Sequence, residues 1–151
     1  MSSALLCNKL SQRCCSKSFV LGFHASFDEG SFASKSRYNP VCQYNSSKPD
    51  KYRIDFFVLV NAVDGLNFIY HLDAYQGKNM NNCNIKEEAW HLSTTQKTVV
   101  NAILQSRIEN DPDGMRELYM DNHYEAALLA DLLHEKYKVL TCGRLRTGRK
   151  G

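Results

Sequence analysis

Residues 52–63, Tyr-Arg-Ile-Asp-Phe-Phe-Val-Leu-Val-Asn-Ala-Val, decide how this chain folds. They begin with alternating polar and apolar side chains and end almost entirely apolar, a pattern typical of a central strand. Asp64-Gly65 follows, and this dipeptide favours a tight turn between paired strands. A second strand is predicted over residues 67–75, which end before Gln76-Gly77. The sequence therefore predicts an antiparallel hairpin.

The segments before this hairpin predict one more strand and a long connection. Residues 18–27 are rich in apolar side chains and predict a strand that arrives at Asp28-Glu29-Gly30. Residues 30–51 are rich in Ser, Asn and Lys and contain two prolines, so they predict a loop or an irregular crossing. The chain therefore enters the hairpin by way of an irregular segment.

The segments after the hairpin alternate between helix and strand. Residues 78–92 are polar and predict a loop. Ser93 or Thr94 can cap a helix that runs to about residue 109. A short strand over 116–120, a second amphipathic helix over about 123–136 and a strand over 138–146 follow. Strands joined partly by a hairpin and partly by helical crossovers predict an α/β fold, a mixed sheet flanked by helices.

Composition sets limits on the class of protein. At 151 residues, with 43% hydrophobic and 23% charged side chains, the chain suits one soluble domain. A net charge of +3 permits nucleic acid as a partner without indicating it. An apolar run of about 18 residues is missing, so no membrane partner is expected. The six cysteines include no C-x-x-C pair, which argues against a zinc site and favours free intracellular thiols.

Two aspartates stand out by their positions next to strands. Asp28 follows the first predicted strand, and Asp121 ends the strand Glu-Leu-Tyr-Met-Asp. Side chains at strand ends can converge on one edge of a mixed sheet, and two carboxylates there repel unless a cation bridges them. A hard ion such as Mg²⁺ suits that role and suits phosphate chemistry. The alternative is structural: Asp28 starts a turn, and Asp121 caps the next helix.

Six short blocks carry a family resemblance across about four-fifths of the chain. In chain order they are Asp28-Glu29; Lys35-Ser36-Arg37; Tyr44 with Lys48-Pro49-Asp50-Lys51-Tyr52; Tyr75-Gln76-Gly77-Lys78; Tyr119-Met120-Asp121-Asn122-His123-Tyr124; and Cys142-Gly143-Arg144-Leu145-Arg146 with Arg149-Lys150-Gly151. Each block alone is weak, but their order resembles that of the catalytic core of piggyBac-type DDE transposases. On this resemblance residues 18–151 are a partial catalytic core, and residues 1–17 stay unassigned.

The resemblance implies a ribonuclease-H-like fold and cut-and-paste DNA transposition in the nucleus. In that family three aspartates hold two Mg²⁺ ions that assist in-line displacement at phosphorus. Asp28 and Asp121 correspond to the first two. The partners implied are DNA and a second copy in a homodimer. The expected contacts to DNA phosphates come from two basic clusters: Lys35, Arg37, Lys48 and Lys51, and Arg144, Arg146, Arg149 and Lys150.

Departures from the family pattern limit the expected activity. The third aspartate lies beyond Gly151 in the family, so the sequence predicts a truncated sheet that binds Mg²⁺ weakly and does not cleave DNA. Ser36, Arg53 and Arg144 also depart from the family pattern, as expected for a decayed copy or a divergent subfamily. Whether the chain is an enzyme is therefore left open. The alternatives are an exapted, non-catalytic DNA-binding or protein-interaction module and one exon of a longer, active transposase.

Overall fold

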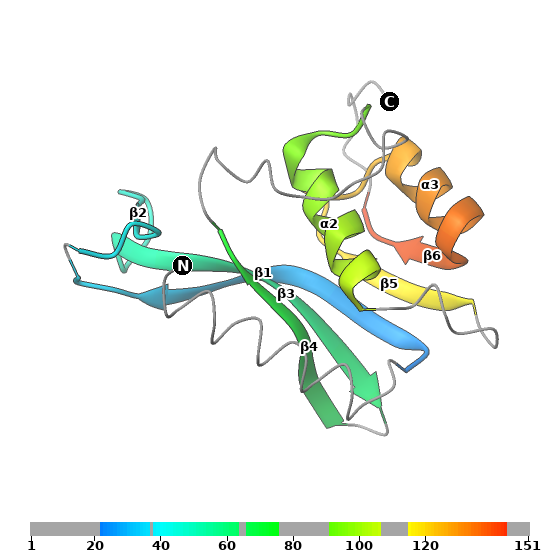
Figure 1. Ribbon diagram of the computed structural model, residues 1–151, viewed down its shortest axis with the longest axis horizontal. Helices are drawn as coiled ribbons and strands as arrows, with labels where there is room; N and C mark the ends of the chain where they lie inside the picture. Colours follow the sequence, from blue (N-terminus) through cyan, green and yellow to red (C-terminus); the bar gives the residue numbers. More distant parts are fainter. Residues whose placement is uncertain (1–21, 37, 64–65, 76–90, 107–114, 145–151) are drawn as a thin grey trace.

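A computed structural model describes residues 22–36, 38–63, 66–75, 91–106 and 115–144. Within these ranges one mixed sheet carries six strands. Five of them follow the order β2-β3-β1-β5-β6, and β4 pairs with β3 over part of its length, on the side away from β1 (Figure 1). The elements are β1 (His24–Ala33), β2 (Gln43–Tyr44), β3 (Tyr52–Val63), β4 (Leu66–Ala74), α2 (Thr94–Gln105), β5 (Arg116–Met120), α3 (Ala127–Tyr137) and β6 (Val139–Cys142).

The predicted hairpin is confirmed: β3 lies inside the sheet, and β4 lies at its edge. Strands β3 and β4 pair antiparallel, and the pairing shifts register between Leu59 and Val60. Leu59 lies opposite His71 and Val60 opposite Ile69, so Tyr70 is the extra residue of a bulge. The bulge lets both Tyr70 and His71 be buried, at 6% and 3% exposure. The hydroxyl of Tyr70 then donates a hydrogen bond to the backbone carbonyl of Ser106, just after α2 (3.1 Å).

Strand β1 joins the hairpin to the rest of the sheet. It pairs antiparallel with β3 along its whole length and parallel with β5 from His24 to Phe27. Strands β5 and β6 are also parallel, and α3 makes the crossover between them. The expectation of a mixed α/β sheet, built from hairpin and crossover connections, is therefore confirmed.

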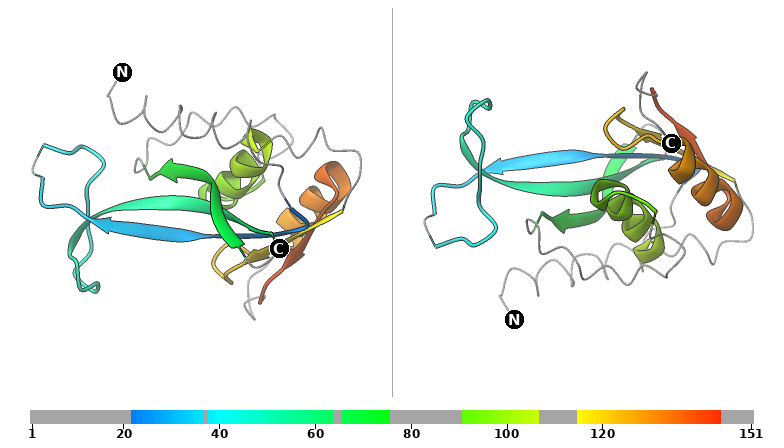
Figure 2. Two further views of the ribbon diagram at one scale, coloured as in Figure 1. Left: turned by 90° about the horizontal axis from the view of Figure 1, so that it is seen from below. Right: turned by 90° about the horizontal axis from the view of Figure 1, so that it is seen from above.

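Both described helices cover the same side of the sheet (Figure 2). We call this side the covered face; it carries the buried side chains of Phe27, Leu59 and Leu118. Alternate residues of the same strands point to the open face, which carries His24, Ser26 and Asp28. Helix α2 contributes its apolar stripe to the core, and α3 does the same. The buried helical residues are Thr98, Val99, Val100, Ala102, Ile103, Leu129, Leu133 and Tyr137.

Local chemistry explains where α2 begins and α3 ends. Ser93 caps α2, as predicted, in a capping box: its hydroxyl accepts from the Gln96 amide, and the Gln96 side chain accepts from the Ser93 amide. Helix α3 ends at Tyr137, and the left-handed backbone of its C-cap Lys138 (φ 55°) turns the chain into β6.

Several expectations about element bounds were wrong; among them, α2 ends at Gln105 instead of about residue 109, and β6 ends at Cys142 instead of residue 146. Strand β1 does not end at residue 27 but continues to Ala33, because it pairs with β3 throughout. The expected loop contains β2, which pairs with the start of β3. Helix α3 begins at Ala127 instead of about residue 123, because the amides of Tyr124 and Glu125 bond to the Asp121 carbonyl in a turn. Leu128 of this helix is 48% exposed.

Two further observations concern residues singled out in the sequence. Cys42 and Cys142 are free thiols, as predicted. Cys7, Cys14, Cys15 and Cys83, and the predicted loop over residues 78–90, lie outside the described residues. Among the residues that the structure describes, no helix is long and apolar enough to cross a membrane.

Candidate functional site

Asp28 and Asp121 occupy neighbouring positions on adjacent parallel strands. The pairing of β1 with β5 ends with Phe27 opposite Met120. Continuing that register by one residue places Asp28 opposite Asp121, one strand spacing of about 4.8 Å away. Phe27 and Met120 are buried on the covered face, so Asp28, the next residue of β1, points to the open face, and Asp121 follows directly after Met120. Both aspartates are exposed there.

The backbone fixes each carboxylate in a similar way. One oxygen of Asp28 accepts a hydrogen bond from the amide of Glu29 at 2.7 Å. One oxygen of Asp121 accepts from the amide of Asn122 at 2.6 Å. In each case the donor is the backbone amide of the residue that directly follows the aspartate.

The purely structural interpretations of these aspartates do not fit the structure. Asp28 does not start a turn; it lies in the middle of β1, opposite Val58 of β3. Asp121 does not cap a helix, because the N-cap of α3 is Ala126, which makes no side-chain cap bond. Asp121 instead directly follows β5, which ends at Met120, and begins the turn that leads to α3. The two exposed acids therefore neither start a turn in β1 nor cap α3; each carboxylate accepts a hydrogen bond from the amide of the next residue.

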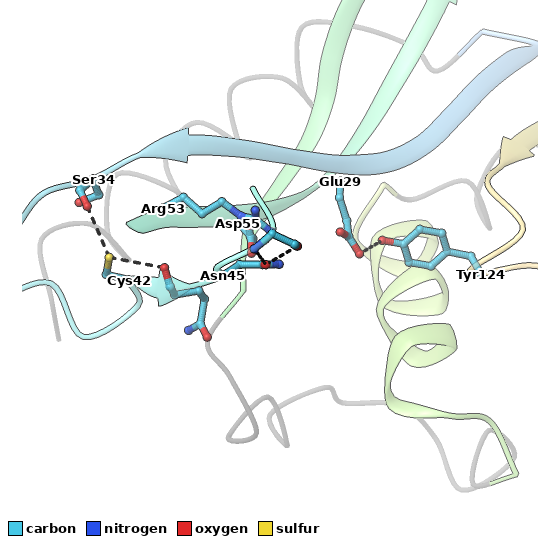
Figure 3. A network of polar contacts seen from close by, with 9 residues as sticks. Glu29, Ser34, Cys42, Asn45, Arg53, Asp55 and Tyr124 are labelled. Carbon is cyan, nitrogen blue, oxygen red and sulfur yellow. Dashed lines mark hydrogen bonds and ion pairs between the residues drawn. The ribbon is translucent and has the colours of Figure 1, made fainter. Parts of the chain in front are cut away.

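A buried tyrosine connects the two aspartate motifs on the opposite side of the sheet. The Tyr124 hydroxyl donates a hydrogen bond to the Glu29 carboxylate at 2.6 Å (Figure 3). Its ring packs edge-on against Phe27 with a centroid distance of 5.0 Å. Glu29 directly follows Asp28, and Tyr124 follows Asp121 by three residues. The contact therefore holds the turn after β5 against β1, next to both aspartates.

The pKa of the Tyr124 hydroxyl is raised by its burial and by the carboxylates around it. Burial raises the pKa of its hydroxyl far above the ordinary value. The hydrogen bond to Glu29 and the negative charges of Glu29, Asp28 and Asp121 raise this pKa further. Tyr124 is therefore a neutral donor at physiological pH, within electrostatic reach of three carboxylates. Sequence analysis placed Tyr124 in the block that holds Asp121 but did not predict its contact with Glu29.

Residue 143 has to be a glycine because Glu125 and the Met120 backbone lie too close for a side chain there. A Cβ at this position would lie 2.5 Å from a carboxylate oxygen of Glu125 and 2.9 Å from the Met120 carbonyl oxygen. Glu125 is itself buried and accepts a hydrogen bond from the Thr141 hydroxyl at 2.9 Å. The glycine thus lets β6 pass close to the end of β5, where Asp121 is placed.

A small pocket lies on the Glu29 side of the sheet. It has a volume of about 200 Å³ and is lined by Glu29, Asp55, Phe56, Phe57, Tyr75, Thr95 and His123. Asp55 is paired with the buried Arg53 guanidinium at 2.5 Å (Figure 3). In the described part of the chain, no group of three or more His, Cys, Asp or Glu side chains could hold a metal ion.

The predicted basic residues divide between two places. Arg144 follows β6 by two residues, so it lies at the same end of the sheet as Asp121 and is exposed. Lys35, Lys48 and Lys51 are exposed at the far end of the β1–β3 pair. Four other members of the predicted clusters lie outside the described residues: Arg37, Arg146, Arg149 and Lys150.

Comparisons with known proteins place this geometry in a family. A family model described as Transposase IS4 matches residues 5–151. The fold resembles that of a piggyBac transposase solved by cryo-EM as a synaptic complex with hairpin DNA, with a TM-score of 0.73 and 21% identity. The match covers 94% of this chain and 27% of that chain, so this chain spans about a quarter of its solved relative. No curated protein sequence matches.

Proposed function

This chain belongs to the IS4 transposase family, and from that premise we propose that its aspartate pair binds a divalent metal ion in contact with DNA phosphate. One observation carries the proposal: Asp28 and Asp121 are exposed neighbours on adjacent parallel strands, on a face that the described helices leave open. Side-by-side carboxylates repel each other, and a bound cation removes that repulsion.

The chemistry of the two side chains fits Mg²⁺. This ion prefers oxygen ligands and commonly takes one or two carboxylates, water and phosphate oxygens of the substrate. The aspartate pair offers the carboxylates, and its exposure leaves room for water and phosphate. When bound, the ion would polarise a phosphoryl oxygen and lower the pKa of a bound water. The hydrogen bonds from the Glu29 and Asn122 amides orient the two carboxylates toward that position.

Arg144 supports the choice of DNA as the partner. Its exposed guanidinium lies at the carboxyl end of β6, beside the end of β5 that carries Asp121. An exposed guanidinium at this end of the sheet suits a phosphate that also contacts the metal ion. The solved relative was determined with hairpin DNA, which agrees with this choice. A nuclear location, where DNA is the substrate, belongs to the same proposal.

We expect the 151-residue chain alone to bind metal and DNA without cutting the DNA. A single carboxylate pair gives a weak site, because the second metal ion of a two-metal mechanism would lack protein ligands of its own. A purified chain that nicks DNA with Mg²⁺, and loses that activity in Asp121→Ala, would contradict this expectation. The second candidate is an exapted, non-catalytic DNA-binding module. Loss of DNA affinity in Arg144→Gln but not in Asp28→Asn would favour it.

Thermal unfolding with Mn²⁺ or Mg²⁺ tests the metal site directly. Metal at 100 times Kd should stabilise the wild-type chain by about 2.7 kcal/mol. Asp28→Asn and Asp121→Asn should lose that stabilisation, because each removes an anionic ligand. Asp131→Asn is the matched control, since Asp131 is an exposed aspartate on α3. Equal metal stabilisation in all three variants would sink the proposed site.

A further inference from the structure

The β1–β3 pair continues beyond the helices as an extended arm (Figure 1). The arm comprises residues 30–36 and 38–54 and includes β2 at its tip. Its open face carries Phe32, Tyr44 and Tyr52, which are 69%, 60% and 59% exposed. Tyr38, in the connection before β2, is 95% exposed. Four aromatic side chains therefore face solvent on a part of the molecule that neither described helix covers.

Sheet register explains why three of these rings share a face. Tyr44 lies directly opposite Tyr52, and Phe32 lies opposite Ile54, two residues further along β3. The two tyrosine rings contact each other with a centroid distance of 5.0 Å and an interplanar angle of 53°. Antiparallel pairing holds them in place. They form a fixed aromatic platform on the open face.

The composition of the arm distinguishes nucleic acid from protein as its partner. Away from the arm, the exposed large apolar side chains are largely aliphatic; they include Ile69, Met115, Leu128 and Leu140. On the arm all four are aromatic. Its exposed charges within the described residues are Lys35, Lys48 and Lys51 against a single Asp50. Protein interfaces are depleted in lysine, whereas grooves for single-stranded nucleic acid combine cations with aromatic rings.

The platform and the aspartate pair lie on the same face of the same strands. Asp28, Gly30 and Phe32 are alternate residues of β1, so they point to the same face of the sheet. The Ser34 amide donates a hydrogen bond to the Tyr52 carbonyl at 3.0 Å, so Tyr52 of β3 lies beside Ser34. Ser34 follows Asp28 by six residues along the chain. At about 3.3 Å per residue this separation is roughly 20 Å. A DNA strand rising about 3.4 Å per nucleotide covers it in roughly six nucleotides.

We propose that the Tyr44–Tyr52 platform stacks on unpaired bases of DNA that extends from the aspartate pair, with the arm lysines on its phosphates. The proposal rests on the proposed function, because it takes DNA to be the partner at this face. It adds a structural preference: the arm selects single-stranded DNA, since only unstacked bases expose their faces to a tyrosine ring. Stacking tolerates any base, so little sequence preference is expected.

Fluorescence anisotropy with a labelled oligo-dT of about 12 nucleotides, a length within known single-strand site sizes, tests the platform. Tyr44→Ala and Tyr52→Ala should each weaken binding of this strand by about 5- to 150-fold. Tyr44→Phe should retain binding because it keeps the ring. Phe23→Ala is the matched control, since Phe23 is a 52% exposed ring outside the arm. Far-ultraviolet circular dichroism checks that each variant is folded.

Salt titration separates stacking from charge. Each of Lys35→Gln, Lys48→Gln and Lys51→Gln should lower the salt slope of single-strand binding by about 0.7. The tyrosine variants should leave that slope unchanged and bind a duplex of equal length as tightly as wild type. A wild-type chain that binds DNA, with Tyr44→Ala and Tyr52→Ala equal to Phe23→Ala, would overturn the platform alone. A wild-type chain that binds no DNA would overturn the platform and the DNA contact together.

Discussion

The covered and open faces of the sheet are built from the same strands but hold different chemistry. On β1 the covered face receives Ala25 and Phe27, which are 4% and 1% exposed, whereas the open face receives Asp28 and Phe32. Adjacent residues of one strand thus belong to the core and to the candidate site. The core can hold the site in place without supplying its ligands, because side chains alternate between faces.

The largest expected effect contrasts two phenylalanines of β1. Phe27→Ala should destabilise the chain by about 3–5 kcal/mol, because its ring is buried against Phe57 and Tyr124. Phe32→Ala should change the free energy of unfolding by less than about 0.5 kcal/mol, because that side chain is exposed. Urea denaturation of both variants measures the difference. Similar losses in both would mean that the open face is packed as well.

The covered face should also make the chain sensitive to acid. Burial lowers the pKa of His71 to about 4 from 6.5, so the folded state keeps this imidazole neutral. The unfolded chain binds a proton as pH falls below 6.5, while the folded chain resists protonation until about pH 4. Stability from this residue is therefore complete above pH 6.5 and falls as pH decreases toward 4, by on the order of 3 kcal/mol.

Replacing the buried imidazole tests this source of acid sensitivity. His71→Phe should reduce the loss of unfolding free energy between pH 7.5 and pH 4.5, as measured by urea denaturation at each pH. Its stability at neutral pH can change through packing, so the comparison is made between the two pH values within each protein. An unchanged pH dependence would place the acid-sensitive group elsewhere.

The smallest predicted effect contrasts two tyrosines near Asp121. Tyr124→Phe should cost about 1–2 kcal/mol, because it removes a hydrogen bond to the Glu29 carboxylate from a buried ring. Tyr119→Phe removes an exposed hydrogen bond to Glu117 and should cost less than about 0.5 kcal/mol. Chemical denaturation measures both. Equal costs would indicate that the Tyr124 contact contributes no more than a surface bond.

Much of the sheet could be predicted from local patterns. The apolar run of β3 with its Asp-Gly turn indicated the hairpin, and Ser93 marked the start of α2. The bounds of β1 and α3 could not be predicted in this way. Strand β1 continues to Ala33 because it pairs with β3, which is far away in the sequence. Helix α3 begins only at Ala127 because backbone hydrogen bonds to the Asp121 carbonyl form a turn first.

The sequence by itself determined the family motifs and the two aspartates among them. It also determined the alternation of polar and apolar side chains along the strands, which separates Asp28 from the core residue Phe27. Their order along the chain was enough to suggest a DDE transposase, and the family match confirms it. Only the tertiary structure decided that Asp28 and Asp121 are neighbours, since parallel pairing joins strands 93 positions apart. It also decided that Tyr124 bonds to Glu29 and that Tyr44 meets Tyr52. The physical reason is that strand register is a property of paired backbones and no single segment encodes it.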